Sequence, residues 1–175
     1  GESVYDEASH SGVLRHLYMR RGEMSGEMMV CVVANGAALH EEALLVEMLR
    51  EAVPEITGVL LNINREKTNV VLGKTCRTLW GKGTVTDTLS GLAFEIAPHA
   101  FYQVNRTQAE RLYGKAAEYA GLTGAETLLD LYCGTGTIGL SMAKSAKKLI
   151  GVEIVPAAVE NARRNAERNA IQNAE

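Results

Sequence analysis

Three glycines and one acid stand at a spacing that could hold a charged organic ligand. Gly134, Gly136 and Gly139 follow an apolar run that begins at residue 128, and Asp130 lies inside that run. A glycine-rich loop between a buried strand and a helix lets a ligand approach the backbone and directs free N–H groups at it. The pattern therefore predicts a strand, a ligand-binding loop and a helix, in that order.

The identity of the ligand depends on Asp130. The three glycines also fit the dinucleotide pattern G-x-G-x-x-G, which is weak evidence when it stands alone. Asp130 lies four positions before the first glycine. A carboxylate there would repel a pyrophosphate, whereas it would attract the ammonium and sulfonium groups of S-adenosylmethionine. Asp130 therefore favours S-adenosylmethionine over NAD.

A second acid, Glu153, ends the next predicted strand, which covers residues 148–153. An acid roughly 20 residues past such a loop commonly accepts hydrogen bonds from ribose hydroxyls. NAD and S-adenosylmethionine share that ribose. Glu153 therefore supports an adenosine-containing ligand without choosing between the two.

A helix is predicted directly before the glycine-loop strand. Asn105 and Gln108 form a capping-box pattern at its start, and Gly121 ends it. Its apolar face is predicted to consist of Ala109, Leu112, Tyr113, Ala116, Ala117 and Ala120. Gln103 stands just before this helix, where local sequence favours a turn or capping role over a ligand contact.

The glycine loop continues into a helix predicted over residues 137–146. After the strand at 148–153, another helix is predicted over 156–170, with a proline in its first turn and Ala158, Ala162, Ala166 and Ala170 toward the sheet. Only two strands of a parallel sheet are then present, so the chain has the pattern of a fragment. Because open sheet edges pair readily, we expect self-association, an element swap or a covering helix.

The N-terminal part has the pattern of an α+β lobe over residues 1–97, followed by the glycine-loop domain over 98–175. We predict a hairpin over 14–19 and 28–33, a tight turn at Ser90-Gly91, and further strands over 58–64, 69–73, 84–89 and 92–96. A helix over 40–52 is predicted to place Leu44, Leu45, Met48, Leu49 and Ala52 on one face.

Composition excludes several classes of protein. The chain has 175 residues, is 46% hydrophobic and carries a net charge of -3, so no global basic field attracts nucleic acid. No apolar run reaches the roughly 20 residues of a membrane span, and we expect a cytoplasmic protein. Cys31, Cys76 and Cys133 are odd in number and widely spaced. They predict reduced thiols, with no disulfide, metal or iron–sulfur site.

Two groups of basic residues are candidates for RNA contacts. Lys74, Arg77 and Lys82 belong to a region with a local excess of positive charge. A solvated strand face and a phosphate path explain that excess equally well. The second group combines basic side chains with aromatic rings, which together can bind unstacked RNA. It consists of Arg15, Arg20, Arg21, His16 and Tyr18.

Two paired signatures then carry a resemblance to a known family. One is Phe101-Tyr-Gln-Val-Asn105 followed by Gln108-Ala-Glu-Arg-Leu-Tyr113, and the other is Asp130-Leu-Tyr-Cys-Gly-Thr-Gly136 followed by Gly151-Val-Glu153. At this spacing they closely resemble RNA uracil-5-methyltransferases, especially the type that modifies bacterial 23S ribosomal RNA. The resemblance implies a Rossmann-like S-adenosylmethionine-dependent methyltransferase fold, truncated here and preceded by the α+β lobe.

The resemblance also implies roles for individual residues. The implied S-adenosylmethionine pocket consists of Gln103, Asp130, Tyr132, Gly134, Gly136, Thr137 and Glu153. In the family a cysteine thiolate adds to carbon 6 of uracil, carbon 5 attacks the sulfonium methyl, and a base removes the proton. Both catalytic residues are expected downstream of residue 175. Cys133 belongs to the glycine-loop signature, so a buried structural role is expected for it.

Other functions stay open from the sequence. The chain could be a non-catalytic nucleotide- or RNA-binding module that keeps the glycine loop as a scaffold. It could act on transfer RNA instead of ribosomal RNA, and a nicotinamide-dependent oxidoreductase is a further alternative. As given, the fragment is expected to be inactive alone.

Overall fold

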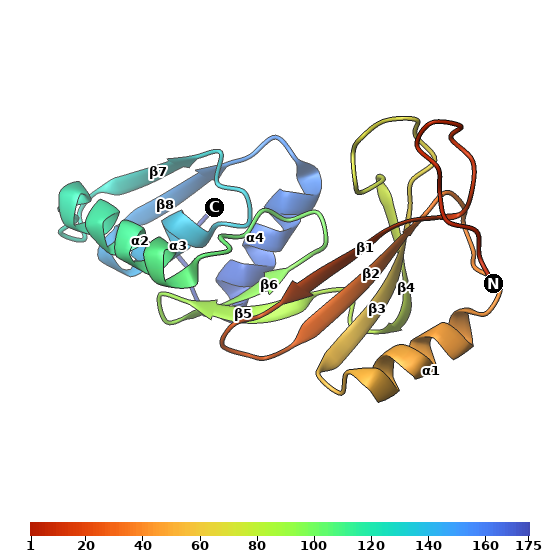
Figure 1. The fold of residues 1–175 in the computed structure, drawn as a ribbon. Helices are drawn as coiled ribbons and strands as arrows, with labels where there is room; N and C mark the ends of the chain where they lie inside the picture. Colours follow the sequence, from red (N-terminus) through yellow and green to blue (C-terminus); the bar gives the residue numbers. More distant parts are fainter. The chain divides into compact units, whose positions relative to one another are not determined.

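In the computed structural model, which describes residues 1–175, a four-stranded sheet forms in the N-terminal part of the chain (Figure 1). The strand order is β1-β2-β3-β4. β1 pairs antiparallel with β2, β2 pairs parallel with β3, and β3 pairs antiparallel with β4. The elements are β1 (Leu14–Arg21), β2 (Met28–Ala34), α1 (Glu42–Ala52), β3 (Ile56–Ile63) and β4 (Thr75–Gly81).

The predicted hairpin and the helix are confirmed, but the predicted strand over residues 69–73 is wrong. β4 begins at Thr75 instead. The reason lies in Asn62, whose side chain accepts a hydrogen bond from the Gly73 N–H at 2.7 Å and donates one to the Gly73 carbonyl at 2.8 Å. Because this side chain takes both polar groups of Gly73, the segment before β4 stays a loop.

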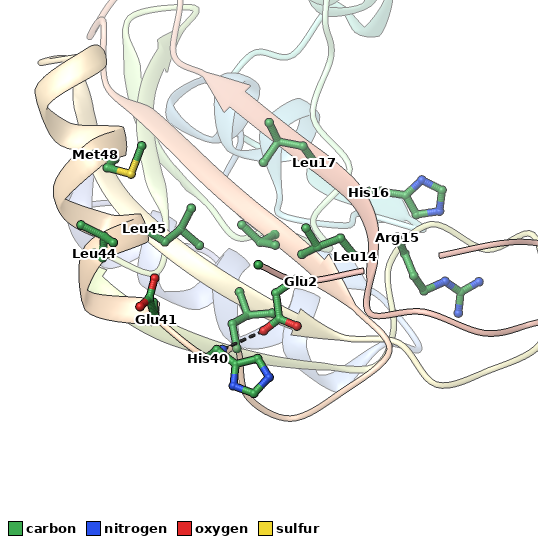
Figure 2. A pocket seen from close by; sticks show the side chains of 13 residues that line it. Glu2, Leu14, Arg15, His16, Leu17, His40, Glu41, Leu44, Leu45 and Met48 are labelled. Carbon is green, nitrogen blue, oxygen red and sulfur yellow. Dashed lines mark hydrogen bonds between the residues drawn. The ribbon is translucent and has the colours of Figure 1, made fainter. Parts of the chain in front are cut away.

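The apolar face of α1 also differs from the prediction. Val46 is buried and packs with Leu49 on the central strands, whereas Leu44 and Met48 are exposed. α1 connects β2 to β3 and packs on β3 and β4, so the edge strand β1 is left partly uncovered. A groove of about 640 Å³ remains between α1 and β1, with Leu17 on its strand side (Figure 2).

The second unit contains a hairpin, three main helices and a parallel pair of strands (Figure 1). β7 pairs parallel with β8, with Leu129 opposite Ile150 and Leu131 opposite Val152. The elements are β5 (Val85–Leu89), β6 (Leu92–Ile96), α2 (Arg106–Ala120), β7 (Thr127–Leu131), α3 (Thr137–Met142), β8 (Lys148–Val152) and α4 (Pro156–Arg168), with a short helical turn over Ala143–Ser145.

The division of the chain falls earlier than the sequence suggested. Contacts separate Gly1–Gly22 with Gly26–Val85 from Glu23–Ser25 with Thr86–Glu175, rather than residues 1–97 from 98–175. Most of the β5–β6 hairpin therefore belongs to the second unit. The physical reason is its core, because Phe94 packs in the same buried cluster as Leu140.

Several local signals in the second unit are confirmed. Ser90 and Gly91 both have positive φ, as a tight hairpin turn requires. The Asn105 side chain caps α2 by accepting a hydrogen bond from the Gln108 N–H at 3.1 Å, and Gly121 ends that helix in the left-handed conformation.

Other details of these helices were mispredicted. Leu112 is exposed rather than part of the buried face of α2. α3 ends at Met142, and α4 ends at Arg168, so Ala170 lies outside the helix with a φ of 52°. The buried positions of α4 are Asn161 and Asn165, whereas its alanines are half-buried or exposed.

The two edges of the parallel pair are not equivalent. The last residues of the chain pair with the outer edge of β8, because Ala174 bridges Leu149 in parallel. Beyond β7 no strand follows, and Leu129 and Leu131 on one sheet face are 54% and 57% exposed. The apolar run that begins at residue 128 was expected to form a buried strand, but one face of β7 is exposed in this chain. No helix is long and apolar enough to cross a membrane.

Candidate cofactor-binding site

The glycine loop between β7 and α3 has the close backbone approaches that glycines permit. Gly136 has a φ of 83°, and a Cβ there would come within 2.9 Å of Leu140. At Gly139 a Cβ would lie 2.7 Å from Oδ2 of Asp130. Side chains at these two positions would therefore force the loop and the start of α3 apart.

Glu153 follows β8 and closes onto this loop. Its Oε2 accepts a hydrogen bond from the Gly134 N–H at 3.0 Å, and its Oε1 accepts two more, from Ile154 at 2.7 Å and Val155 at 2.9 Å. These backbone donors, led by that of Val155, lower the pKa of Glu153 below its usual range. An ionised carboxylate is therefore held at the carboxyl ends of the two parallel strands.

Asp130 lies beneath the loop. Its Oδ2 accepts a hydrogen bond from the Gly139 N–H at 2.9 Å, so the side chain ties β7 to α3. Its Oδ1 makes no hydrogen bond with the protein. Burial raises the pKa of this carboxyl. Asp130 thus has a structural partner in addition to the electrostatic role that the sequence suggested.

Tyr132 stands out by its backbone and by its exposure. Its φ is 61°, which is unfavourable for a residue with a bulky side chain, and its surface is 89% exposed. An exposed aromatic ring gains nothing from packing that would offset the strain. Such outliers gather at ligand-binding sites, which makes Tyr132 a candidate contact.

Thr137 and Gln103 are placed differently. The Thr137 hydroxyl lies 3.1 Å from the hydroxyl of Tyr113, which joins the start of α3 to α2. Gln103 is half-buried and makes no hydrogen bond, so its amide is free for another partner. No hydrogen bond links Gln103 directly to Glu153 or Asp130.

A cavity of about 240 Å³ lies below the loop, lined by Asp130, Cys133 and Gly136 together with Val159 and Ala162 of α4. Pockets for drug-sized ligands start at roughly 300 Å³. This pocket is therefore smaller than a usual site for a drug-sized ligand. The exposed rim formed by Tyr132, Gly134 and Glu153 is the better candidate for an adenosine-sized ligand.

Comparison with known proteins decides the family. Residues 62–175 match the family described as tRNA (uracil-5-)-methyltransferase. The chain belongs to the RNA uracil-5-methyltransferase family. This membership confirms the resemblance of the paired signatures, and it contradicts the alternative of a nicotinamide-dependent oxidoreductase.

Relatives and solved structures agree with this family. A protein of Lactiplantibacillus plantarum described as an uncharacterized RNA methyltransferase is 49% identical over 173 residues, which are 99% of this chain and 38% of the relative. One from Staphylococcus epidermidis with the same description is 46% identical, over 98% of this chain and 38% of its own length. The chain therefore spans less than two fifths of these relatives.

The structure of a Pyrococcus abyssi tRNA (uracil-54, C5)-methyltransferase in complex with S-adenosyl-L-homocysteine is similar with a TM-score of 0.81 and 30% identity. The match covers 98% of this chain and 41% of that one. A Methanocaldococcus jannaschii Trm5 in complex with adenosine is similar in fold alone, at a TM-score of 0.54 and 14% identity over 92% of this chain and 46% of that one. The predicted Rossmann-like S-adenosylmethionine-dependent methyltransferase fold is confirmed.

In this member of the methyltransferase family, the Cys133 side chain packs against Gly151. Its thiol would lie 3.0 Å from a Cβ on Gly151, and burial together with the charges of Asp130 and Glu153 raises its pKa. A thiol that stays protonated is a poor nucleophile.

Sequence reasoning missed Asn165, which fixes the glycine loop from α4. This buried amide donates to the Thr135 carbonyl at 3.1 Å and accepts from the Glu95 N–H at 2.7 Å. One sequence pattern could have identified it: asparagine recurs at positions 161, 165 and 169, on one side of an otherwise alanine-rich helix. A four-residue period places such side chains on one face.

Lys74, Arg77 and Lys82, the first group of basic candidates, all have acidic partners in the first unit. Lys74 pairs with Glu66 at 3.2 Å, Lys82 pairs with Glu27 at 2.6 Å, and Arg77 makes a two-pronged ion pair with Glu42. In the second basic group, Arg20 donates to the Tyr18 hydroxyl at 2.9 Å and Arg15 is buried.

Proposed function

We propose that this chain is part of an enzyme that transfers a methyl group from S-adenosylmethionine to carbon 5 of a uridine in RNA, with 23S ribosomal RNA as the substrate. The observation that carries the proposal is the ionised Glu153 held against the Gly134 N–H where β7 and β8 end. Ligands of open parallel sheets bind at the carboxyl ends of the strands.

The residues present fit this cofactor. Bound there, S-adenosylmethionine would supply an electrophilic methyl group on a sulfonium. Glu153 would accept hydrogen bonds from the ribose hydroxyls, exchanging or sharing its bond with Gly134. The exposed ring of Tyr132 offers a flat apolar face beside it. The combined negative charge of Asp130 and Glu153 favours a cationic ligand over a pyrophosphate.

The chain's own part in catalysis is then to bind and orient the methyl donor. Gln103, with its free amide, and Thr137 at the start of α3 complete the proposed set of cofactor contacts. The attacking thiolate and the base that removes the uracil proton are proposed to lie outside residues 1–175. The packed, protonated Cys133 supports this division, because its thiol is kept from acting as a thiolate.

The N-terminal lobe over residues 1–97 is proposed to face the RNA. Its predicted contacts Lys74, Arg77 and Lys82 are each neutralised by an acid of the same unit. Exposed ion pairs are weak, so phosphates could replace the carboxylates. We nevertheless expect these three residues to contribute less to the RNA affinity than basic side chains that have no acidic partner.

Transfer RNA is the second candidate substrate. The matching family carries a transfer RNA description, and the structural relative from Pyrococcus abyssi is a transfer RNA methyltransferase. The paired signatures favour ribosomal RNA. A non-catalytic RNA- or nucleotide-binding module is the third candidate.

One experiment separates the three. The full-length protein is incubated with S-adenosylmethionine labelled in the methyl group and with unmodified transcripts of 23S ribosomal RNA or of transfer RNA. Label in 5-methyluridine of the ribosomal transcript alone supports the proposal, and label in transfer RNA alone supports the second candidate. Cofactor and RNA binding without label would show a binding module.

A further inference from the structure

A buried arginine supports the loop between β3 and β4. The Arg15 side chain is 0% exposed, and Figure 2 shows it directed away from α1. Its guanidinium donates to the carbonyls of Asn64 at 3.0 Å, Glu66 at 2.7 Å and Thr68 at 2.9 Å. One side chain thus binds the carbonyls of every second residue from Asn64 to Thr68.

Asn64 holds the same loop from its other end. This buried amide donates to the carbonyls of Val70 at 2.7 Å and Val71 at 3.1 Å, and it accepts from the Glu66 N–H at 3.1 Å. Residues 65–71 are all exposed. We name residues 65–71 the β3–β4 loop; its backbone is ordered by buried polar groups while its side chains face solvent.

This arrangement is costly for stability. Burying a guanidinium costs free energy unless it is paired, and the carboxylate of Glu7 lies as far away as 3.9 Å. The Arg15 Nε is also buried without a hydrogen-bond partner. The ring of Tyr5, 4.4 Å from the guanidinium carbon, offsets part of the cost. A free-energy cost of this kind at a surface loop suggests that the conformation of the loop serves binding.

The β3–β4 loop carries cations that have no acidic partner. Arg65 and Lys67 are exposed and make no hydrogen bond or ion pair, unlike Lys74, which pairs with Glu66. The same loop also presents two apolar side chains to solvent. Val70 and Val71 are 54% and 43% exposed. Unpaired cations beside small apolar groups suit a strand of phosphates, riboses and bases.

We propose that the β3–β4 loop is an RNA-binding surface, in which Arg65 and Lys67 contact phosphates and Val70 and Val71 pack on ribose or base. Arg15 and Asn64 are positioning residues that set the loop before RNA arrives. Preorganisation lowers the entropy that binding would otherwise cost. The proposal rests on the proposed function in one respect, namely that RNA is the substrate.

The test removes the two charges from the full-length protein by the double substitution Arg65→Ala and Lys67→Ala. We expect affinity for the 23S or transfer RNA transcript to fall roughly tenfold at about 0.1 M salt. The slope of log affinity against log salt should flatten by roughly 1.4 for two lost phosphate contacts. S-adenosylmethionine affinity should stay unchanged. An unaltered RNA affinity and slope would overturn the proposal.

Two controls separate local contact from net charge and from folding. The double substitution Lys144→Ala and Lys147→Ala removes the same charge from exposed sites of the other unit and should leave RNA affinity unchanged. An equal loss there would show a non-local charge effect and reject the loop. The double substitution Arg65→Lys and Lys67→Arg keeps both charges, so it should retain most of the RNA affinity that the double alanine variant loses.

A third variant tests the positioning role. Arg15→Met keeps Arg65 and Lys67 but removes three hydrogen bonds, so it should weaken RNA binding and increase proteolysis within residues 65–71. Unchanged proteolysis would reject that role, while the double alanine variant still decides the surface. If wild-type protein methylates RNA but the double variant binds RNA normally, the inference fails alone. If binding depends on both cations but no label is transferred, the proposed function fails alone.

Discussion

Oε2 of Glu153 and the backbone N–H of Gly134 lie 3.0 Å apart and form a hydrogen bond between the end of β8 and the glycine loop. The acid therefore occupies the loop before any ligand arrives. A ribose that binds Glu153 must share this carboxylate with Gly134 or displace it. The site is held in shape by the same group that would recognise the ligand.

Glu153→Ala in the full-length protein removes the proposed acceptor for two ribose hydroxyls. S-adenosylmethionine affinity, measured by calorimetry, should weaken by about 1 to 3 kcal/mol. Glu160→Ala is the matched control, since this exposed carboxylate of α4 pairs with Arg164 at 3.3 Å and not with the loop. Full cofactor affinity in the Glu153 variant would contradict the assignment.

Asp130→Asn separates the charge of this residue from its hydrogen bond. The amide oxygen can still accept from Gly139, so stability should be preserved while affinity for the cationic cofactor falls severalfold. Burial raises the pKa of Asp130 above 3.8, so the folded state keeps a proton that the unfolded state has lost. Wild-type stability relative to the variant should therefore fall as pH rises through the folded pKa.

Thermal melts of both proteins over a pH series check the stability part, and calorimetry at neutral pH checks the affinity. A difference in stability that grows in the opposite direction would show that the Gly139 hydrogen bond to the ionised form outweighs burial. Equal cofactor affinity in both proteins would remove Asp130 from the electrostatic argument.

Tyr132→Gly should stabilise the protein and weaken cofactor binding at once. Glycine adopts a φ of 61° without strain, so we expect a gain of about 1 kcal/mol in the free energy of unfolding. The loss of the ring should raise the cofactor dissociation constant. Denaturant melts and calorimetry measure the two effects. Tyr132→Phe keeps the ring and should bind normally; a glycine variant that binds equally well would make the strain unrelated to this ligand.

The 175-residue chain should self-associate through the open face and edge of β7. Leu129 and Leu131 leave an apolar strip there, and β7 lacks an outer neighbour. Sedimentation should show oligomers that Leu129→Lys reduces. Leu112→Lys, at an exposed leucine of α2, is the control and should change nothing. A monomeric wild-type chain would reject this prediction.

The sequence by itself determined the strand–loop–helix at Gly134 to Gly139, the cap at Asn105 and the turn at Ser90-Gly91. These features depend on local backbone conformations that few residue types adopt, so residue types at short spacing are enough to predict them. The paired signatures also determined the family, because their combination spans α2, β7 and β8.

Only the tertiary structure decided which side chains have partners. Arg15 lies some fifty positions before the carbonyls that it binds, and Asn165 joins elements that are far apart in the chain. The pairing of Arg77 with Glu42 and of Lys82 with Glu27 is also non-local. A residue type states what a side chain can bind, whereas burial and distance decide what it does bind. For that reason the sequence selected Lys74, Arg77 and Lys82, which are paired, while the structure showed that Arg65 and Lys67 in the nearby loop make no ion pair.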